Sequence, residues 1–246
     1  MELTKQIQSG NIIVRDDADA TLKIKLIDVT TTNSLMAYGE IRVANDDLSL
    51  DGSFLAEDPI TISIGLGDNV PEVVFTGLIS SAIQGQLIIL EVRGNAYSMR
   101  SKIVKKSLNK TNAKKVLQEI LSKAGVAYEI GNIPDIKRHS YIMQSGAVAE
   151  EIHRFNESFG LNLTPYFDRT GKLIVKTAEE NIKATDIIFE ADEFKKFENG
   201  ILETIIDTEI DIYNQIEIMD VQYYVASNRF LLNDRITKSY IAVTQI

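Results

Sequence analysis

The sequence predicts an α+β fold in which β segments at both ends of the chain flank a small α/β insert. Short runs rich in Ile, Val and Leu fill the first hundred residues and return after residue 180, whereas apolar residues recur at helical spacing only between them. We therefore expect a β-barrel-like domain over 1–96, an α/β insert over 97–180, and a β domain over 181–246 that completes or duplicates the barrel.

The N-terminal segment carries six predicted strands, and strands at this spacing indicate a barrel or a sandwich. Ile60, Ile62 and Ile64 alternate with polar residues, as expected of an antiparallel strand with one face in water. The predicted strands cover residues 11–15, 21–28, 35–43, 59–66, 72–80 and 86–93.

The first helix of the insert is predicted over residues 111–125. It has a wide apolar stripe, Gly125 stops it, and residues 126–130 form a short strand. This helix and strand make one small unit.

A second helix of the insert is predicted to begin at Ser145, which is a good N-cap residue. Its apolar residues recur up to Phe159, and Gly160 stands where a left-handed C-terminal cap belongs. The apolar period then changes to two, so the helix leads into a hairpin with its turn at residues 168–171.

Strand patterns return in the C-terminal segment. A strand set this short would leave exposed edges if it stood alone, so we expect it to join the N-terminal β unit. The predicted strands cover residues 187–190, 201–212, 215–224 and 239–243.

Composition bounds the class of protein. The chain has 246 residues, of which 44% are apolar, so it can bury a sizeable core. No apolar run approaches the roughly 20 residues that cross a bilayer, and the start MELTKQIQSG lacks a signal-peptide layout, so we expect no membrane anchor. The absence of cysteine excludes disulfides, thiolate catalysis and cysteine-ligated metals.

Candidates for catalysis are weak. His139 and His153 are far apart in sequence and have no evident partners for zinc binding or general-base chemistry, so we interpret them as surface or interface residues. Some pair of the 35 acidic residues must converge in any fold, which makes a carboxylate pair uninformative. We expect no catalytic residue, metal or cofactor.

One acidic loop has part of a calcium-binding pattern. Asp47, Ser49, Asp51, Gly52 and Asp58 occupy positions 1, 3, 5, 6 and 12 of such a loop. Position 12 lacks the usual glutamate and a strand pattern follows it. A loop that connects strands is the favoured interpretation, and calcium binding stays an alternative.

A glycine pair follows a predicted strand at Gly65-Leu66-Gly67. It lacks the third glycine, the lysine and the following helix of a phosphate-binding loop. A hairpin turn is the favoured interpretation.

Positive charge is concentrated between residues 100 and 115, where seven cations occur without an acid. Because the whole chain has a formal charge of −9, the rest carries −16. The run is interpreted either as a solvated helix face or as a surface that docks on an acidic partner or a neighbouring subunit. Sequence-specific nucleic-acid binding is not expected, because no aromatic residues interleave with these lysines. The cations are Arg100, Lys102, Lys105, Lys106, Lys110, Lys114 and Lys115.

Several short segments follow one another in a distinctive order and spacing over about residues 58–177. They are Val74-Phe75-Thr76-Gly77-Leu78-Ile79, Glu91-Val92-Arg93-Gly94, the helix over 111–125, Tyr141-Ile142-Met143-Gln144, Phe159-Gly160 and Gly171-Lys172-Leu173. In this order and spacing the sequence resembles the tail hub family of contractile phages, with a weaker similarity at Tyr213-Asn214-Gln215-Ile216-Glu217-Ile218. That family includes the late control D proteins, the Mu-like and T-even baseplate hubs, and the hub portion of the valine-glycine-repeat spike of type VI secretion.

Two departures concern the subfamily. The sequence reads Arg93-Gly94-Asn95 where many relatives have an acidic residue after the arginine, and the second helix reads Glu151-Ile152-His153-Arg154-Phe155 instead of a phenylalanine-leucine form. They leave the subfamily open.

The resemblance implies structural work without catalysis. In the family three copies form a ring whose two barrel-like domains per copy match a hexameric tail tube, and the ring also holds a trimeric spike. The expected partners are therefore two further copies, a tail tube protein, a spike protein and other baseplate proteins. Because the sequence stops at Ile246, we expect the spike to be a separate protein. The implied location is a virion tail or injection-machine baseplate, assembled in the cytoplasm of a bacterial host.

Two other functions stay open at this point. A tail-associated peptidoglycan hydrolase is the main alternative, although no lysozyme-like or peptidase-like segment is evident. A receptor- or glycan-binding β module is the third, and the absence of tryptophan gives it little support.

Residues on two predicted strands are candidates for interfaces. Phe75 and Gly77 are expected to serve packing and close strand approach more than partner contact. Tyr240, Ile241 and Val243 belong to an apolar strand that either closes the barrel or extends a neighbour's sheet.

Overall fold

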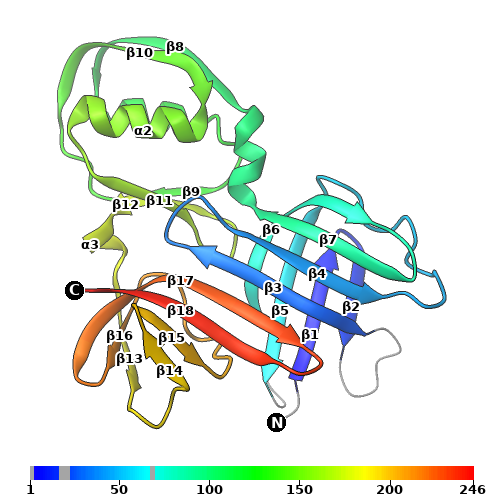
Figure 1. Ribbon diagram of the computed structural model, residues 1–246. Coiled ribbons are helices and arrows are strands. Elements are labelled where there is room, and N and C mark those ends of the chain that lie inside the picture. The colour runs from blue at the N-terminus through cyan, green and yellow to red at the C-terminus, as the bar shows by residue number, and fades with distance from the viewer. Residues whose placement is uncertain (1–2, 17–22, 67–69) are drawn as a thin grey trace.

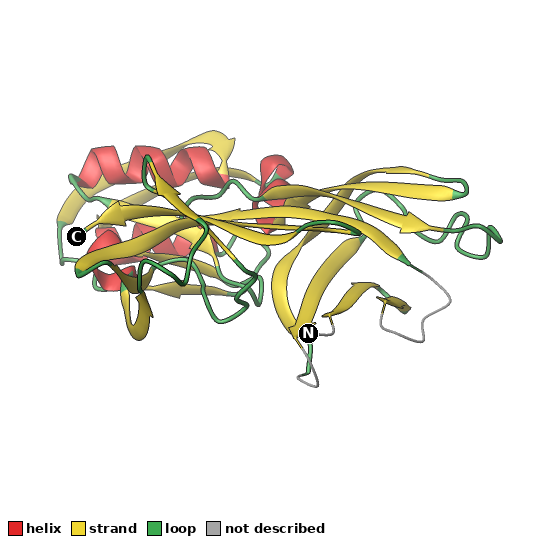
Figure 2. Cartoon of the chain, turned by 60° about the horizontal axis from the view of Figure 1, so that its bottom comes forward, coloured by secondary structure: helices red, strands yellow, loops and turns green. Residues whose placement is uncertain are grey.

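The computed structural model of the chain describes residues 3–16, 23–66 and 70–246. Strands make up most of it and are mainly antiparallel, whereas the helices lie together over one part of the molecule (Figures 1 and 2). The predicted α+β class is confirmed to this extent. In the described part of the chain, 13 strands belong to one sheet. Eleven of them follow the order β14-β15-β18-β17-β3-β4-β7-β6-β5-β1-β2, while β16 pairs with β17 and β13 pairs with β16.

The N-terminal segment contains all six predicted strands and one more, β1. Its apolar residues Leu3 and Ile7 are separated by three polar residues, so the expected alternation is missing. Thr21 and Leu22, at the start of the second predicted strand, lie outside the described residues. The strands are β1 Leu3–Ser9, β2 Ile12–Asp16, β3 Ile24–Thr32, β4 Tyr38–Ala44, β5 Pro59–Leu66, β6 Glu72–Ile83 and β7 Leu87–Gly94.

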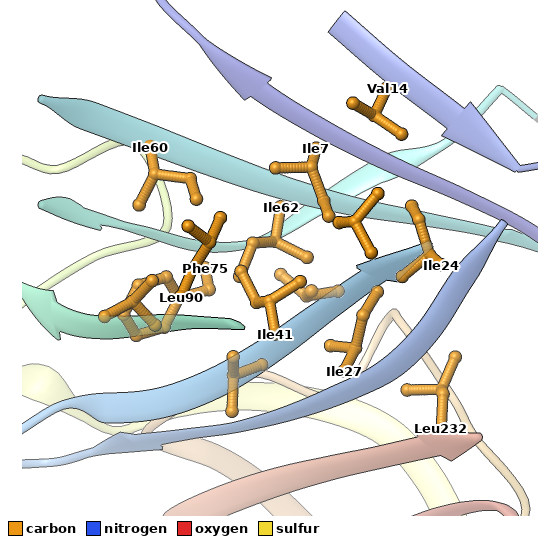
Figure 3. Close-up of a cluster of buried hydrophobic side chains, with 14 of the residues drawn as sticks. Ile7, Val14, Ile24, Ile27, Ile41, Ile60, Ile62, Phe75, Leu90 and Leu232 are labelled. Atoms are coloured by element: carbon orange, nitrogen blue, oxygen red, sulfur yellow. The ribbon is translucent and has the colours of Figure 1, made fainter. Parts of the chain in front are cut away.

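These strands curl around one apolar core. β2, at the end of the pairing order, lies in contact with β3. Side chains from β1 to β7 point into the space between them (Figure 3). Ile7, Ile41, Ile62 and Phe75 are almost completely buried there. Burial of each such side chain stabilises the fold by about 1.5–3 kcal/mol, so this cluster dominates the stability of the segment.

The C-terminal segment joins the same sheet through β17, which pairs antiparallel with β3 from Ser227↔Thr32 to Asn233↔Leu26. Phe230 and Leu232 of β17 enter the N-terminal core. The two terminal segments therefore share a sheet and part of a core. The strands are β13 Lys183–Phe189, β14 Lys196–Glu198, β15 Ile201–Thr204, β16 Asn214–Ile218, β17 Val221–Asn233 and β18 Thr237–Gln245.

Two strand predictions in this segment were wrong in extent. Residues 201–212 form a strand only up to Thr204, although burial continues to alternate beyond it. Residues 215–224 form two strands joined at Met219 and Asp220, whose φ values of 49° and 63° are those of a tight hairpin turn. Apolar alternation persists through both places, so it could not reveal where pairing stops.

The insert contains the predicted helices, the short strand and the hairpin. The strand β9 pairs parallel with β12, and β11 pairs antiparallel with β12. A second, two-stranded sheet consists of β8 and β10. The elements are the 3-10 helix η1 Asn95–Ser101, β8 Ile103–Asn112, α1 Ala113–Leu121, β9 Tyr128–Ile130, β10 Lys137–Ala147, α2 Val148–Phe159, β11 Leu163–Phe167, β12 Leu173–Thr177 and α3 Ala178–Asn181.

The start of α2 differs from the prediction. Ala147, not Ser145, is the N-cap, and the backbone N–H of Ala147 donates a hydrogen bond of 3.3 Å to the side chain of Glu150. β10 continues to Ala147, and Ser145, with φ of 52°, lies where the pairing with β8 shifts register. The end is as predicted, because Gly160 has φ of 63° and caps the helix.

The two helices pack between the small sheets, with α1 against β8 and α2 against β10. Their apolar stripes form a second core with residues of β10, β11 and β12. No helix in the described ranges is both long and apolar enough to span a membrane.

Candidate assembly surfaces

The basic stretch lies mainly on a strand, not on a helix face. Lys105, Lys106 and Lys110 belong to β8, and Lys102 precedes it directly. Only Lys114 and Lys115 lie on α1, and Arg100 lies in the last turn of the 3-10 helix. The interpretation as a solvated helix face was thus wrong for most of the run, because inward residues such as Val104 are too widely spaced to reveal a strand pattern.

Two of the seven cations have partners within the chain. The Nζ atom of Lys106 lies 2.8 Å from Oε1 of Glu119, and the Arg100 guanidinium lies 5.0 Å from the centre of the Tyr97 ring. Within the described ranges, the other five are exposed and form no ion pair. We call the surface that carries these five the basic ribbon: Lys102, Lys105, Lys110, Lys114 and Lys115.

The outer face of the two-stranded sheet beside the basic ribbon is also partly apolar. Ile103 of β8 is 56% exposed and Ile142 of β10 is 65% exposed. Lys105 pairs with Gln144 across the sheet, so a positive charge lies on the same face. Exposed apolar groups bordered by charge are typical of docking surfaces.

An acidic surface was missed by the sequence analysis. Exposed carboxylates lie on β13 and in the loop after it, and none of them forms an ion pair with another described residue. Ile188, in the middle of this surface, is 53% exposed. The signal was present as four acids without a cation between residues 184 and 194. We call this surface the acidic edge: Asp186, Glu190, Asp192 and Glu193.

The candidate residues near the C-terminus lie on β18, which is bonded on both sides. Ser239 to Ala242 pair with β15, and Thr237 to Gln245 pair with β17. Ile241 is completely buried, whereas Tyr240 and Val243 are half-buried. The strand therefore completes the sheet of its own chain along residues 239–242.

Phe75 and Gly77 serve packing inside the chain. Phe75 is 1% exposed in the N-terminal core. A β-carbon added at Gly77 would lie 2.1 Å from the carbonyl oxygen of Arg93, so only glycine allows β6 and β7 to approach here.

Arg169, in the β11–β12 turn, connects the insert to the irregular chain after β15. Its guanidinium donates hydrogen bonds to the carbonyl oxygens of Thr208 and Ile210. Its Nε atom lies 3.2 Å from Oδ1 of Asp211. The carbonyl of Ile210 also accepts a hydrogen bond of 3.0 Å from Nδ2 of Asn228 on β17. Together these donors satisfy backbone carbonyl groups of the irregular chain after β15.

Charged clusters inside the insert are structural. Hydrogen bonds from Lys172 and Lys176, each at 2.5 Å, lower the pKa of Glu129 to about 2. The buried carboxylate of Glu151 accepts a hydrogen bond from Arg154 at 2.9 Å and one from Tyr141 at 3.1 Å. Each carboxylate is therefore held by hydrogen-bond donors of the insert itself.

The histidines lie apart on the surface. His139 is exposed on β10, and Nε2 of His153 lies 3.4 Å from Oε1 of Glu157 on α2. Across the described residues, no group of three or more His, Cys, Asp or Glu side chains converges as a metal site would require.

In the acidic loop, the side chains of Asp47 and Asp58 bind the chain itself. Asp47 accepts a hydrogen bond from the N–H of Ser49, and Asp58 accepts one from the N–H of Leu55. Gly65 and Leu66 belong to β5, and Gly67 lies outside the described residues.

Comparison with known proteins gives fold similarity without sequence similarity. No protein-family model and no curated protein matches the sequence. Several solved structures match over nearly the whole chain. The 43 kDa tail protein of prophage MuSo2 from Shewanella oneidensis aligns with a TM-score of 0.72 and 12% identity, over 99% of this chain and 98% of that one.

Two further structures extend this similarity. A tail protein from Neisseria meningitidis MC58 aligns with a TM-score of 0.72 and 11% identity, over 100% of this chain and 97% of that one. An Escherichia coli component of the type VI secretion system, described as similar to the T4 bacteriophage tail proteins gp27 and gp5, aligns with a TM-score of 0.66 and 7% identity, over 98% and 76%. The chain therefore has the fold of phage tail proteins, and the predicted resemblance is confirmed at this level.

Proposed function

We propose that this chain, which shares its fold with phage tail proteins, is a structural hub of a phage tail or a related contractile injection machine. In this role three copies form a ring that joins a hexameric tail tube to a trimeric spike. The observation that carries the proposal is the match of the complete fold, over 99% of this chain and 98% of the Shewanella tail protein. A small structural motif that occurs in many unrelated proteins would align over a much shorter part of the two chains.

The arrangement of the sheet supports the role. The terminal β segments share one sheet through β3 and β17, and the insert stands beside that sheet (Figure 1). We assign 1–96 and 181–246 to two barrel-like hub domains and 97–180 to the insert domain. The three apolar clusters favour these boundaries. The exceptions are Ile206, Phe230 and Leu232, which belong to the N-terminal cluster, and Tyr166 and Ile174 of the insert, which belong to the C-terminal cluster.

The role requires no bond-making chemistry. The protein would match one rotational symmetry to another and transmit force through closed interfaces. It would work in the virion tail or baseplate, after assembly in the host cytoplasm, in contact with tube, spike and other baseplate proteins. Residues at those contacts would include members of the basic ribbon and, on β18, Tyr240 and Val243.

Counting copies in assembled particles tests the proposal. Particles that contain this chain should show three copies in one layer between tube and spike, by mass or by reconstructed symmetry. Six copies in that layer would contradict the ring of three. Clearing of purified cell wall by the isolated chain, abolished by substitution of a single carboxylate, would instead establish the hydrolase alternative.

A further inference from the structure

We propose that the acidic edge of one copy of this chain binds the basic ribbon of a second copy, head to tail. The inference rests on the proposed ring, and it names the contact that holds neighbouring copies together.

Charge is the first argument. The basic ribbon presents five cations without an ion pair among the described residues, and the acidic edge presents four such carboxylates. Elsewhere, charged groups are often paired across strands, as Lys238 is with Glu203 and Arg229 is with Asp28. Opposite patches of this kind steer association and select the orientation of the partner.

Strand edges are the second argument. In the described part of the chain, β8 pairs only with β10, and β13 pairs only with β16, so each presents one unpaired edge. Unpaired edges are templates for strand addition from another chain. An exposed isoleucine stands beside each edge, Ile103 on β8 and Ile188 on β13, and supplies apolar area to an interface.

The positions of the two surfaces exclude contact within one copy. β8 and β13 lie at opposite ends of the molecule in Figure 1. A contact between different surfaces of two copies is heterologous, and it closes into a ring when the rotation between copies allows. The acidic edge of the last copy then meets the basic ribbon of the first.

Charge exchange tests the contact. Reversal of three charges on either surface should weaken association of the purified chain about tenfold or more at low salt, measured by sedimentation. When the two reversed chains are mixed, every contact between unlike chains joins an acidic surface to a basic one. Association should therefore return, through contacts between unlike chains. The two variants are Lys102→Glu/Lys105→Glu/Lys110→Glu and Asp186→Lys/Glu190→Lys/Asp192→Lys.

A matched control separates this contact from net charge. Asp46→Lys/Asp51→Lys/Glu72→Lys, at exposed acids of the N-terminal segment, changes net charge by the same amount and sign as the acidic-edge variant, and should leave association unchanged. Recovery on mixing also shows that both reversed chains are folded.

Cross-linking gives an independent readout, because the chain has no cysteine. A bismaleimide should join a Ser107→Cys copy to an Ala184→Cys copy, at positions beside the basic ribbon and the acidic edge. It should join two Ser107→Cys copies far less. Equal yields, or a chain that stays monomeric and forms no cross-link, would overturn the inference.

The two proposals fail in different ways. If particles with three copies assemble normally from either reversed chain, the hub proposal stands and the proposed contact between acidic edge and basic ribbon is wrong. Assembly that depends on the basic ribbon but not on the acidic edge would assign the ribbon to a different acidic protein. Particles with six copies in the layer would remove the proposed ring itself.

Discussion

Arg229 and Asp28, which are 201 residues apart in the sequence, are joined by two hydrogen bonds of 2.7 Å from the Nε and Nη2 atoms of the arginine. They lie on β17 and β3, the two strands that unite the terminal β segments. The fork of the guanidinium fits both carboxylate oxygens, so the pair also helps to define the register of these strands.

Replacement of Arg229 by lysine should lower the free energy of unfolding by about 1 kcal/mol or less, because the second hydrogen bond is lost at a half-exposed site. Urea unfolding measures this change. Lys25→Ala, which removes a looser 3.6 Å contact with Asp234, is the control and should have a smaller effect. If Arg229→Lys and Lys25→Ala lowered the free energy of unfolding equally, the second hydrogen bond of Arg229 would contribute no stability.

Phe230→Ala should destabilise the chain by about 3–5 kcal/mol, because this completely buried ring connects β17 to the N-terminal core. Hydrogen exchange should show faster exchange in β3 as well as in β17. Ile13→Ala, at a 57% exposed position on β2, should cost much less. If β3 kept its protection in Phe230→Ala, the shared core would not couple the two segments.

Gly77→Ala should destabilise the chain by about 1–3 kcal/mol, since the new methyl group would lie 2.1 Å from the Arg93 carbonyl oxygen and push β6 from β7. Thermal unfolding gives the comparison. Ser81→Ala on the same strand adds no atom and should be nearly neutral. If Gly77→Ala were as stable as the wild type, β6 and β7 would be able to move apart without loss of stability.

Arg169→Ala should loosen residues 205–213, because the carbonyl group of Thr208 loses the hydrogen bond from Arg169 and that of Ile210 retains the one from Asn228. The expected result is faster hydrogen exchange and proteolysis confined to this segment. Arg169→Lys keeps the charge beside Asp211 but not the fork, and should have an intermediate effect. Unchanged exchange in Arg169→Ala would contradict the anchoring role.

Glu129→Gln should show a stability deficit that depends on pH. Hydrogen bonds from Lys172 and Lys176 lower the folded pKa of Glu129 from 4.5 to about 2, so the charged form stabilises the fold above pH 4.5. That contribution is lost as the pH falls toward 2, where wild type and variant should converge. The side chain is 40% exposed, which limits the difference to about 1 kcal/mol or less.

Urea midpoints between pH 2 and 6 measure this difference. The exposed Glu72→Gln is the control and should show no such convergence. A deficit for Glu129→Gln that persisted unchanged at pH 2 would assign it to packing instead of charge.

The local elements could be predicted because their causes are local. Gly160 ends α2 through its own backbone conformation, and the alternation of Ile60, Ile62 and Ile64 places all three side chains in the N-terminal core. Helix caps and apolar periods act over a few residues, so they can be read before any partner is known. Ser145 failed as a cap because β10, paired with a distant strand, continues past it.

The candidate surfaces depended on long-range pairing. The positive charge from Arg100 to Lys115 was evident in the sequence, but only the pairing of β8 with β10 showed that three of the seven cations lie on a strand with a free edge. The acidic edge could likewise be recognised as a surface only from the structure, in which β13 pairs with β16 alone among the described strands.

The amino-acid sequence by itself determined the α+β class, both main helices and most strands, though not β1, β8, β10 or β14, because apolar period, turn residues and caps act within one element. Tertiary structure alone decided which strands are neighbours, above all β3 with β17, and therefore which edges and charges face outward. A backbone hydrogen bond between Asp28's strand and Arg229's strand has the same chemistry as one to any other strand. The choice among them is made by the shared core, to which the whole chain contributes at once.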